Sequence, residues 1–462
     1  MNTAAVLTAM LPEHLLLLGI VLVIAIDIVG GSRRASLPIA FVFVAAAAVA
    51  AANLALSGYS AAPFAGQFSV DPAALLVKAM VLAFALPVLL MAKGEYGGGA
   101  EFPALLLSSL YGVCLLQSAD SFATVFLGLE LMSLPVYVLV LLAWRRPQSA
   151  EAALKYLVLG GTATAMFLMG ASLLYGTSGS LSIETFARAL AAGDGLARAA
   201  VVLVVLAFFL KAAIVPFHAW APDAYEAASV PVTAYMATVV KAGVMLAAVR
   251  LFANAQLASP MLEIVAALPL LSIVWGNLAA MRQPTLRRMI AYSSIAHAGY
   301  LFYALLGDAA GRLQSVAFYL LAYGLMNLLA FAALPAAADD VGRDRLDNLR
   351  GLFHRAPFAA LMLGIAMLSL AGIPPFPGFV AKFLIFRNVM SAGHATYAVL
   401  GLVGSYLGIY FYLRVIQLMF MSPDAAVAPE GGRHRLAFGA TVACLLAAVL
   451  VAVFPGWVIG RL

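Results

Sequence analysis

A set of ionisable side chains lies inside long apolar stretches of the sequence, where a charged group is expensive to hold and is a candidate for function. Glu130 lies near the middle of one stretch, within Gly128-Leu-Glu-Leu-Met-Ser133, and no basic residue occurs within ten positions of it. A basic partner must therefore come from another segment. The basic members of the set are Lys78, Lys155, Lys211, Lys241, Lys382 and Arg414.

Lysines and a carboxylate in an apolar environment suit proton transfer. Burial lowers the pKa of a lysine, and a nearby carboxylate raises it again. A lysine between these two environments takes up and releases protons near neutral pH, and a row of them with water between forms a proton relay. The alternative is a structural ion pair between helices, for which Glu130 and Lys211 are the candidates. For Lys241 and Lys382, no second acid lies near the middle of a predicted span to pair with them.

Other polar side chains allow two interpretations each. Histidine titrates in the physiological range, so His297 is a candidate bridge in the relay, although a hydrogen-bonded packing role is the alternative. Lys78 lies seven residues from the end of its stretch, so we expect it to extend toward the membrane surface. Arg414 either takes part in proton release on the exit side or also extends toward the membrane surface.

His218, Asp223 and Glu226 follow one another around two prolines, and together they raise the possibility of a metal site. Their spacing is irregular, so we expect instead that Asp223 caps the start of a helix. The two cysteines, Cys114 and Cys444, form no CxxC pair, so no disulfide framework, iron–sulfur ligation or zinc site is indicated. The sequence therefore predicts no metal and no cofactor site in this chain.

The composition places these residues in a membrane. Of the 462 residues, 65% are hydrophobic and only 10% are charged, whereas soluble domains carry about 25% charged residues. Apolar stretches of about 20 residues recur along the chain, long enough to cross a bilayer as helices. No basic segment precedes the first stretch, so a cleaved signal peptide is not expected. The prediction is an all-α polytopic membrane protein, in contact with lipid and not with nucleic acid.

We predict about fourteen membrane-spanning segments. Two of them, residues 198–229 and 357–391, are too long for one straight crossing and contain prolines that break a helix. In a membrane, such a break faces protein or a wet cavity. The predicted spans are 11–29, 36–57, 71–92, 102–119, 121–144, 151–175, 198–229, 231–253, 259–281, 285–306, 312–336, 357–391, 395–421 and 436–458.

The basic residues in the connections and near the ends of the spans predict the orientation. With the first connection on the cytoplasmic side, that side holds fourteen basic residues and the other side holds six. The positive-inside rule then places both termini outside the cytoplasm. The cytoplasmic set is Arg33, Arg34, Lys93, Arg145, Arg146, Arg282, Arg287, Arg288, Arg343, Arg345, Arg350, Arg355, Arg433 and Arg435.

The two long segments also indicate an internal duplication. Each has a small residue before a Pro-Phe step, in Ala213-Ile-Val-Pro-Phe217 and in Ala371-Gly-Ile-Pro-Pro-Phe376, about 160 residues apart. Five predicted spans separate the two breaks, and because that number is odd the repeats are expected to be inverted in the membrane. Inverted repeats with broken helices at matching positions are typical of transporters.

The sequence resembles the antiporter-like membrane subunits of the proton-pumping NADH:quinone oxidoreductase, complex I, over essentially its whole length. Lys382 stands where subunits of the M type typically carry glutamate, so the resemblance favours the N or the L type. The L type carries a long C-terminal lateral helix, for which a sequence that ends at Leu462 is too short, so we expect the N type. The motifs that carry the resemblance are Leu11-Pro-Glu13, Gly128-Leu-Glu-Leu-Met-Ser133, Ser149-Ala-Glu-Ala-Ala-Leu-Lys-Tyr156, Pro216-Phe-His-Ala-Trp-Ala-Pro-Asp-Ala-Tyr-Glu226, Arg288-Met-Ile-Ala-Tyr-Ser-Ser-Ile-Ala-His297 and Gly372-Ile-Pro-Pro-Phe-Pro-Gly-Phe-Val-Ala-Lys382.

The resemblance implies a domain layout inside a single membrane domain, residues 1–462. Two inverted five-helix bundles, helices four to eight and nine to thirteen, contain the broken helices seven and twelve. They are expected at 102–253 and 259–421, after N-terminal helices in 1–100 and before a C-terminal helix at 436–458. One departure is that Ala227-Ala-Ser229 replaces the usual Gly-Ala-Pro after Glu226, which leaves the local shape of that half-helix open.

The resemblance also implies roles for individual residues. Glu130 corresponds to the helix-five glutamate and modulates the proton affinity of Lys211. Lys241 is the central relay site, and Lys382 lies toward the periplasmic exit. The helix-six lysine corresponds to Lys155.

The expected function follows from that resemblance. We expect a translocase subunit of the bacterial inner (plasma) membrane with no redox site of its own. Flavin, iron–sulfur clusters and quinone belong to partner subunits, and the direct partners are neighbouring antiporter-like and small membrane subunits. Two alternatives remain: a subunit of a multisubunit cation/proton antiporter, and a passive scaffold of the membrane arm.

Overall fold

The computed structural model describes residues 3–30, 33–96, 99–143, 147–191, 194–253, 255, 261–334, 344–422 and 435–461. Within these ranges the chain is helical apart from short connections and one two-stranded hairpin. Of the residues used to predict the orientation, Arg145, Arg146, Arg343 and Arg433 lie outside the described residues. The chain divides into two compact units.

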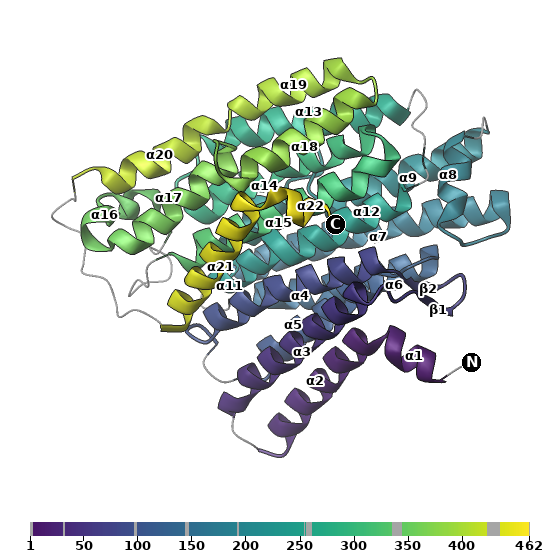
Figure 1. The fold of residues 1–462 in the computed structure, drawn as a ribbon, viewed down its shortest axis with the longest axis horizontal. Helices are drawn as coiled ribbons and strands as arrows, with labels where there is room; N and C mark the ends of the chain where they lie inside the picture. Colours follow the sequence, from purple (N-terminus) through teal and green to yellow (C-terminus); the bar gives the residue numbers. More distant parts are fainter. Residues whose placement is uncertain are drawn as a thin grey trace. The chain divides into compact units, whose positions relative to one another are not determined.

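The first unit comprises residues 1–144, 149–212 and 239–264. Helices α2, α3 and α5 lie side by side (Figure 1), and α5 also packs along α6. The described elements of this unit are α1 (Thr3–Ala9), α2 (Leu11–Ile28), α3 (Ser36–Leu56), β1 (Ala61–Phe64), β2 (Phe68–Val70), α4 (Pro72–Ala92), α5 (Glu101–Gln117), α6 (Phe122–Leu141), α7 (Gln148–Ser178), α8 (Glu184–Ala191), α9 (Gly195–Lys211) and α12 (Lys241–Leu251).

The second unit comprises residues 145–148, 213–238 and 265–462. In this unit, helices α14 and α15 are almost wholly buried; α15 packs against α17 and α18, and α14 packs against α18. Its elements are α10 (Trp220–Ala227), α11 (Val230–Tyr235), α13 (Met261–Ala280), α14 (Leu286–Tyr303), α15 (Ala309–Ala332), α16 (Leu352–Arg355), α17 (Pro357–Ala371), α18 (Pro377–Ser391), α19 (Ala395–Tyr406), α20 (Ile409–Phe420), α21 (Arg435–Val453) and α22 (Pro455–Ile459).

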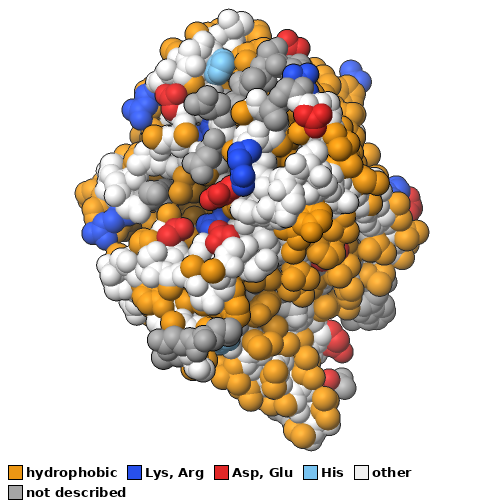
Figure 2. Space-filling view, turned by 90° about the vertical axis from the view of Figure 1, so that its right-hand side faces the viewer, with side chains coloured by type: hydrophobic (Ala, Val, Ile, Leu, Met, Phe, Trp, Pro, Cys, Tyr) orange, Lys and Arg blue, Asp and Glu red, His pale blue; other side chains and the backbone are white. Residues whose placement is uncertain are grey.

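The predicted all-α membrane architecture is confirmed. Among the described residues, eleven helices are long and apolar enough to cross a membrane, and α5 and α17 are shorter apolar helices. The count of fourteen spans stays a prediction. Only 28% of α2 and 22% of the apolar window of α3 are buried inside the chain, and hydrophobic side chains cover a wide area of the face in Figure 2. An apolar surface of this extent suits contact with lipid.

The helix breaks lie where the prolines predict them. Helix α9 ends at Lys211 and α10 begins at Trp220, with Pro216 between them. Helix α17 ends at Ala371, and α18 begins at Pro377. Each break opens with a left-handed residue three positions before a proline. Ala213 precedes Pro216 and has φ 62°, and Gly372 precedes Pro375 and has φ 85°.

Arg287 anchors the start of α14. Its side chain is almost fully buried, Nε and Nη2 donate to the two carboxylate oxygens of Asp344 at 2.7 and 2.9 Å, and Nη1 donates to the carbonyl of Ala228 at 2.6 Å. We expect Asp344→Ala to leave a buried unpaired charge, which costs about 3–5 kcal/mol. The thermal unfolding temperature of the purified protein should then fall clearly.

The control for this prediction is Asp347→Ala. The Asp347 carboxylate is 75% exposed and lies 3.5 Å from Arg345, and surface pairs contribute about 0–1 kcal/mol. Equal unfolding temperatures for the two variants would contradict the anchoring role of Asp344.

Candidate functional site

Two of the residues predicted from the sequence, Glu130 and Lys211, meet inside the first unit. Lys211, the last residue of α9, donates from Nζ to Oε1 of Glu130 on α6 at 3.2 Å. Nζ also donates to Oγ of Ser133 at 3.2 Å, and Thr164 of α7 donates to Oε1 of Glu130 at 2.5 Å. The Lys211 side chain is 5% exposed and the Glu130 side chain is 20% exposed. Two neutral hydroxyl groups therefore hold the pair, and the Glu130 carboxylate remains partly exposed.

Close packing between α5 and α6 fixes the position of Glu130. A Cβ added at Gly112 would lie 2.3 Å from the backbone nitrogen of Met132, and one at Gly128 would lie 2.9 Å from the Leu116 side chain. Ser133 follows Glu130 by three positions, so the two side chains share one face of α6. The α6 backbone can hardly shift while both glycines stay in contact.

Lys241 is the first residue of α12 and follows a π-helical segment, Met236–Val240. The residue is 7% exposed. Helix α12 packs against α5, since Gln117 donates from Nε2 to the carbonyl of Gly243 at 3.3 Å. Single π-helical turns inside helices occur frequently at functional sites.

His297 lies in a chain of hydroxyl groups within the second unit. Tyr319 of α15 contacts Nδ1 at 2.7 Å, and Tyr412 of α20 contacts Nε2 at 3.1 Å. The Tyr412 hydroxyl also forms a hydrogen bond with Ser293, one turn earlier on α14. Both ring nitrogens are thus engaged by phenols, which can each donate and accept a proton.

Lys382 lies beside the second break. Its Nζ donates to the carbonyl of Ala371, the last residue of α17, at 2.9 Å, and to Oγ of Ser405 at 3.0 Å. The carbonyls at a helix C-terminus lack intrahelical partners and carry partial negative charge. The break in the helix therefore supplies an acceptor for the lysine, and Nζ also lies 5.2 Å from the centre of the Tyr300 ring.

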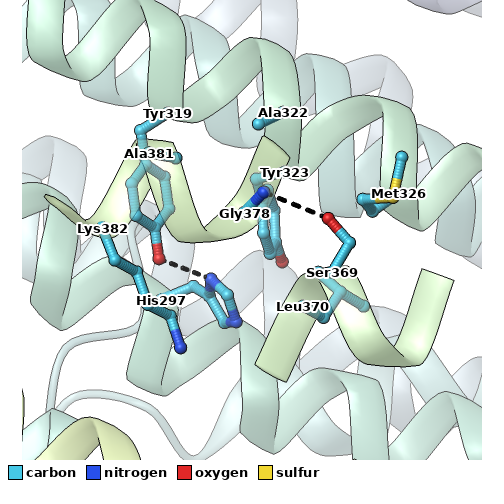
Figure 3. Close-up of a pocket in the computed structure, with 10 residues that line it drawn as sticks. All are labelled: His297, Tyr319, Ala322, Tyr323, Met326, Ser369, Leu370, Gly378, Ala381 and Lys382. Carbon is cyan, nitrogen blue, oxygen red and sulfur yellow. Dashed lines mark hydrogen bonds between the residues drawn. The ribbon is translucent and has the colours of Figure 1, made fainter. Parts of the chain in front are cut away.

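His297 and Lys382 line the same small cavity. In Figure 3, Tyr319 points toward His297 and the Lys382 side chain extends beside them. The cavity has a free volume of about 10 Å³, which is close to the minimum that holds one water molecule. One water could therefore join the histidine to the lysine.

Lys155 lies apart from the other sequence-predicted residues. Its side chain is 45% exposed on α7 and forms an ion pair with Glu151, one turn earlier, at 2.7 Å. The structure brings together Glu130 with Lys211, and His297 with Lys382, and it places Lys155 on the surface of the chain.

Two expectations about polar residues are wrong. Lys78 does not extend to the surface: its side chain is 0% exposed and pairs with Glu13 at 2.6 Å. Asp223 does not cap a helix, because it lies inside α10 and accepts from Arg288 at 3.0 Å. In both cases the side chain forms an ion pair with an oppositely charged residue from a distant part of the sequence.

Arg414 extends to a helix end, where it donates to the carbonyl of Met281 at 2.9 Å. The prediction missed Tyr319, Tyr412 and Glu13. Glu13 was visible only as part of a motif near the start of a span. Within the described residues, no group of three or more His, Cys, Asp or Glu side chains could hold a metal ion.

The fold and these sites define a polytopic membrane protein that holds ionisable side chains inside and beside its broken helices. Residues 119–408 match the family described as NADH:quinone oxidoreductase/Mrp antiporter, TM. This chain belongs to that family.

Named relatives agree with this assignment. The chain is 38% identical over 424 residues to NADH-quinone oxidoreductase subunit N of Pelobacter propionicus, covering 91% of this chain and 90% of the relative. A chain of respiratory complex I from Thermus thermophilus has a TM-score of 0.84 at 35% identity, with 97% and 98% coverage. A chain of the Mrp complex from Dietzia has a TM-score of 0.83 at 23% identity, covering 98% and 96%, which shows the shared fold alone.

Proposed function

We propose that this chain is a proton-translocating membrane subunit of a respiratory NADH:quinone oxidoreductase. The observation that carries the proposal is the contact between Glu130 and Lys211, a carboxylate–lysine pair inside apolar helices with one partner still 20% exposed. A charge change in a neighbouring subunit can act on the exposed side of Glu130. The redox chemistry belongs to other subunits, which carry flavin, iron–sulfur clusters and quinone.

In the proposed mechanism, loss of the contact between Glu130 and Lys211 weakens the hold of Lys211 on its proton, which moves to Lys241. The proton then passes through His297 to Lys382 and leaves on the periplasmic side. Lys155 is exposed in this chain, and its part in the relay depends on a neighbouring subunit that covers its surface.

The proposal includes the setting of the chain. It lies in the bacterial inner membrane with both termini in the periplasm, and neighbouring antiporter-like and small membrane subunits contact it. The two inverted repeats, at 102–253 and 259–421, are supported by the left-handed residues that open the two breaks, Ala213 and Gly372.

A single reconstitution tests the function. A tag on this chain is used to purify its complex, which is placed in liposomes and supplied with NADH and quinone in a sodium-free buffer. We expect internal acidification that an uncoupler abolishes. Acidification that requires Na⁺, or purification without any NADH-oxidising subunits, would instead favour the cation/proton antiporter.

Tyr412→Phe tests the hydroxyl chain at His297. The phenyl ring keeps the packing of α20 but removes the hydroxyl that bridges His297 and Ser293. Removal of a positioned proton-transfer group slows its step by about 10²-fold or more, so the number of protons moved per NADH should fall. Tyr410→Phe is the matched control because that side chain is 61% exposed. Equal proton yields in the two variants would remove Tyr412 from the relay.

A further inference from the structure

A second glutamate–lysine pair lies in the N-terminal helices, outside the matched family region. Glu13 is in the first turn of α2 and Lys78 is in the second turn of α4, and their side chains meet at 2.6 Å. Both side chains are 0% exposed. The pair is thus more deeply enclosed than the Glu130–Lys211 pair, and the relay described above does not use it.

Within the part of the chain that the structure describes, one oxygen of this buried carboxylate accepts no hydrogen bond. Among the described residues, no donor reaches Oε2 of Glu13. A buried acceptor that lacks a donor costs about 1–3 kcal/mol, and more when it is charged. Tyr111 and Cys114 of α5 are close enough to interact electrostatically with Glu13. The enclosed site therefore has an unused proton acceptor and a phenol on the adjacent helix.

An apolar cover closes the other side of the pair. The ring centre of Phe68 on β2 lies 4.9 Å from Nζ of Lys78. Phe68 packs in a buried cluster with Ala9 of α1, Val70 of β2 and Leu75 of α4. The hairpin and α1 thus seal the lysine where α2 and α4 begin, the ends that the proposed orientation places on the periplasmic side.

Stability alone gives a weak reason for such a pair. Replacing a buried ion pair by apolar residues of similar volume is often neutral or stabilising. An ionisable group inside a membrane protein is instead a functional candidate by default. The unsatisfied Oε2 adds to the cost of holding Glu13 as a carboxylate.

We propose that Glu13 and Lys78 form an additional proton-exchange site near the periplasmic end of the chain, an inference that rests on the proposed function. Lys78 passes a proton from Nζ to Oε1 of Glu13, which leaves a neutral amine and a neutral carboxylic acid. A water that enters past the hairpin from the periplasmic side accepts the proton from the acid and leaves as a hydronium ion. The amine takes one proton from a hydronium ion that arrives from the cytoplasmic side, which restores the ion pair with one proton moved.

The test is a double variant that removes both charges without leaving either partner alone. The complex that contains Glu13→Leu and Lys78→Met is purified and reconstituted, and protons moved per NADH are measured. We expect the flux through this site to fall about 10²-fold, which lowers the proton yield of the whole complex. The control is Asp347→Leu with Arg345→Met, which removes an exposed pair and should leave the yield unchanged.

A full proton yield from the double variant overturns the inference. If that variant does not assemble, Glu13→Asp decides, because it keeps the charge but draws the carboxylate back from Nζ: a lower yield supports the exchange site, and a full yield overturns it. The proposed function is tested separately by Lys241 variants. It predicts that they lose pumping, whatever the result for the Glu13 variants.

Discussion

Lys241→Met is expected to abolish most of the proton translocation that passes through this chain. Lys241 is 7% exposed and begins α12 directly after the π-helical segment. Methionine has a similar length and no titratable group, so the packing of α12 is retained while proton transfer at this position is removed. Loss of a proton-transfer group reduces the rate of its step by about 10²–10⁴-fold. Pumping is measured as internal acidification of liposomes for each NADH oxidised.

The control for Lys241 is Lys93→Met. Lys93 is an exposed residue at the end of α4, so its replacement removes the same charge from a solvated position and should leave pumping intact. Full pumping by an assembled Lys241→Met complex would refute the relay. It would favour the alternative in which this chain is a scaffold and other subunits move protons.

The sequence was sufficient to predict which helices break and that most of the chain forms apolar helices. Proline removes a backbone donor wherever it occurs in a helix, so Pro216 and Pro375 mark the breaks without knowledge of their neighbours. Glu130 was a candidate because a carboxylate in an apolar stretch needs a partner. Both interpretations of the sequence, the proton relay and the structural ion pair, place Glu130 beside Lys211.

The errors arose where the answer depended on the partner helix. Whether Lys78 extends to the surface or turns inward is decided by Glu13, 65 positions earlier. The sequence also did not show that the Lys155 side chain is 45% exposed on α7, and its role in the relay stays a prediction. Tyr319 and Tyr412 were two tyrosines among 17, and only the fold places them on the two nitrogens of His297.

Glu130→Gln should reduce pumping nearly as strongly as the change at Lys241. The amide has the shape of the carboxylate but no charge, so it cannot modulate the proton on Lys211. Lys211→Met should have the same effect, because two groups that act as one unit lose their function when either is removed. The scaffold alternative predicts that both variants assemble and pump normally.

Thr164→Val refines this prediction, since it changes the pair without neutralising it. Thr164 donates to the same oxygen, Oε1, that Lys211 contacts. A hydrogen bond to a charged group contributes about 1.5–3 kcal/mol, so its loss should alter the balance between the closed and open pair and lower the proton yield only in part. Thr162→Val is the matched control, because Thr162 donates to a carbonyl of its own helix on an exposed face. If Thr164→Val pumps like the Thr162 control while Glu130→Gln does not pump, the charge of Glu130 is essential but its hydrogen bond from Thr164 is not.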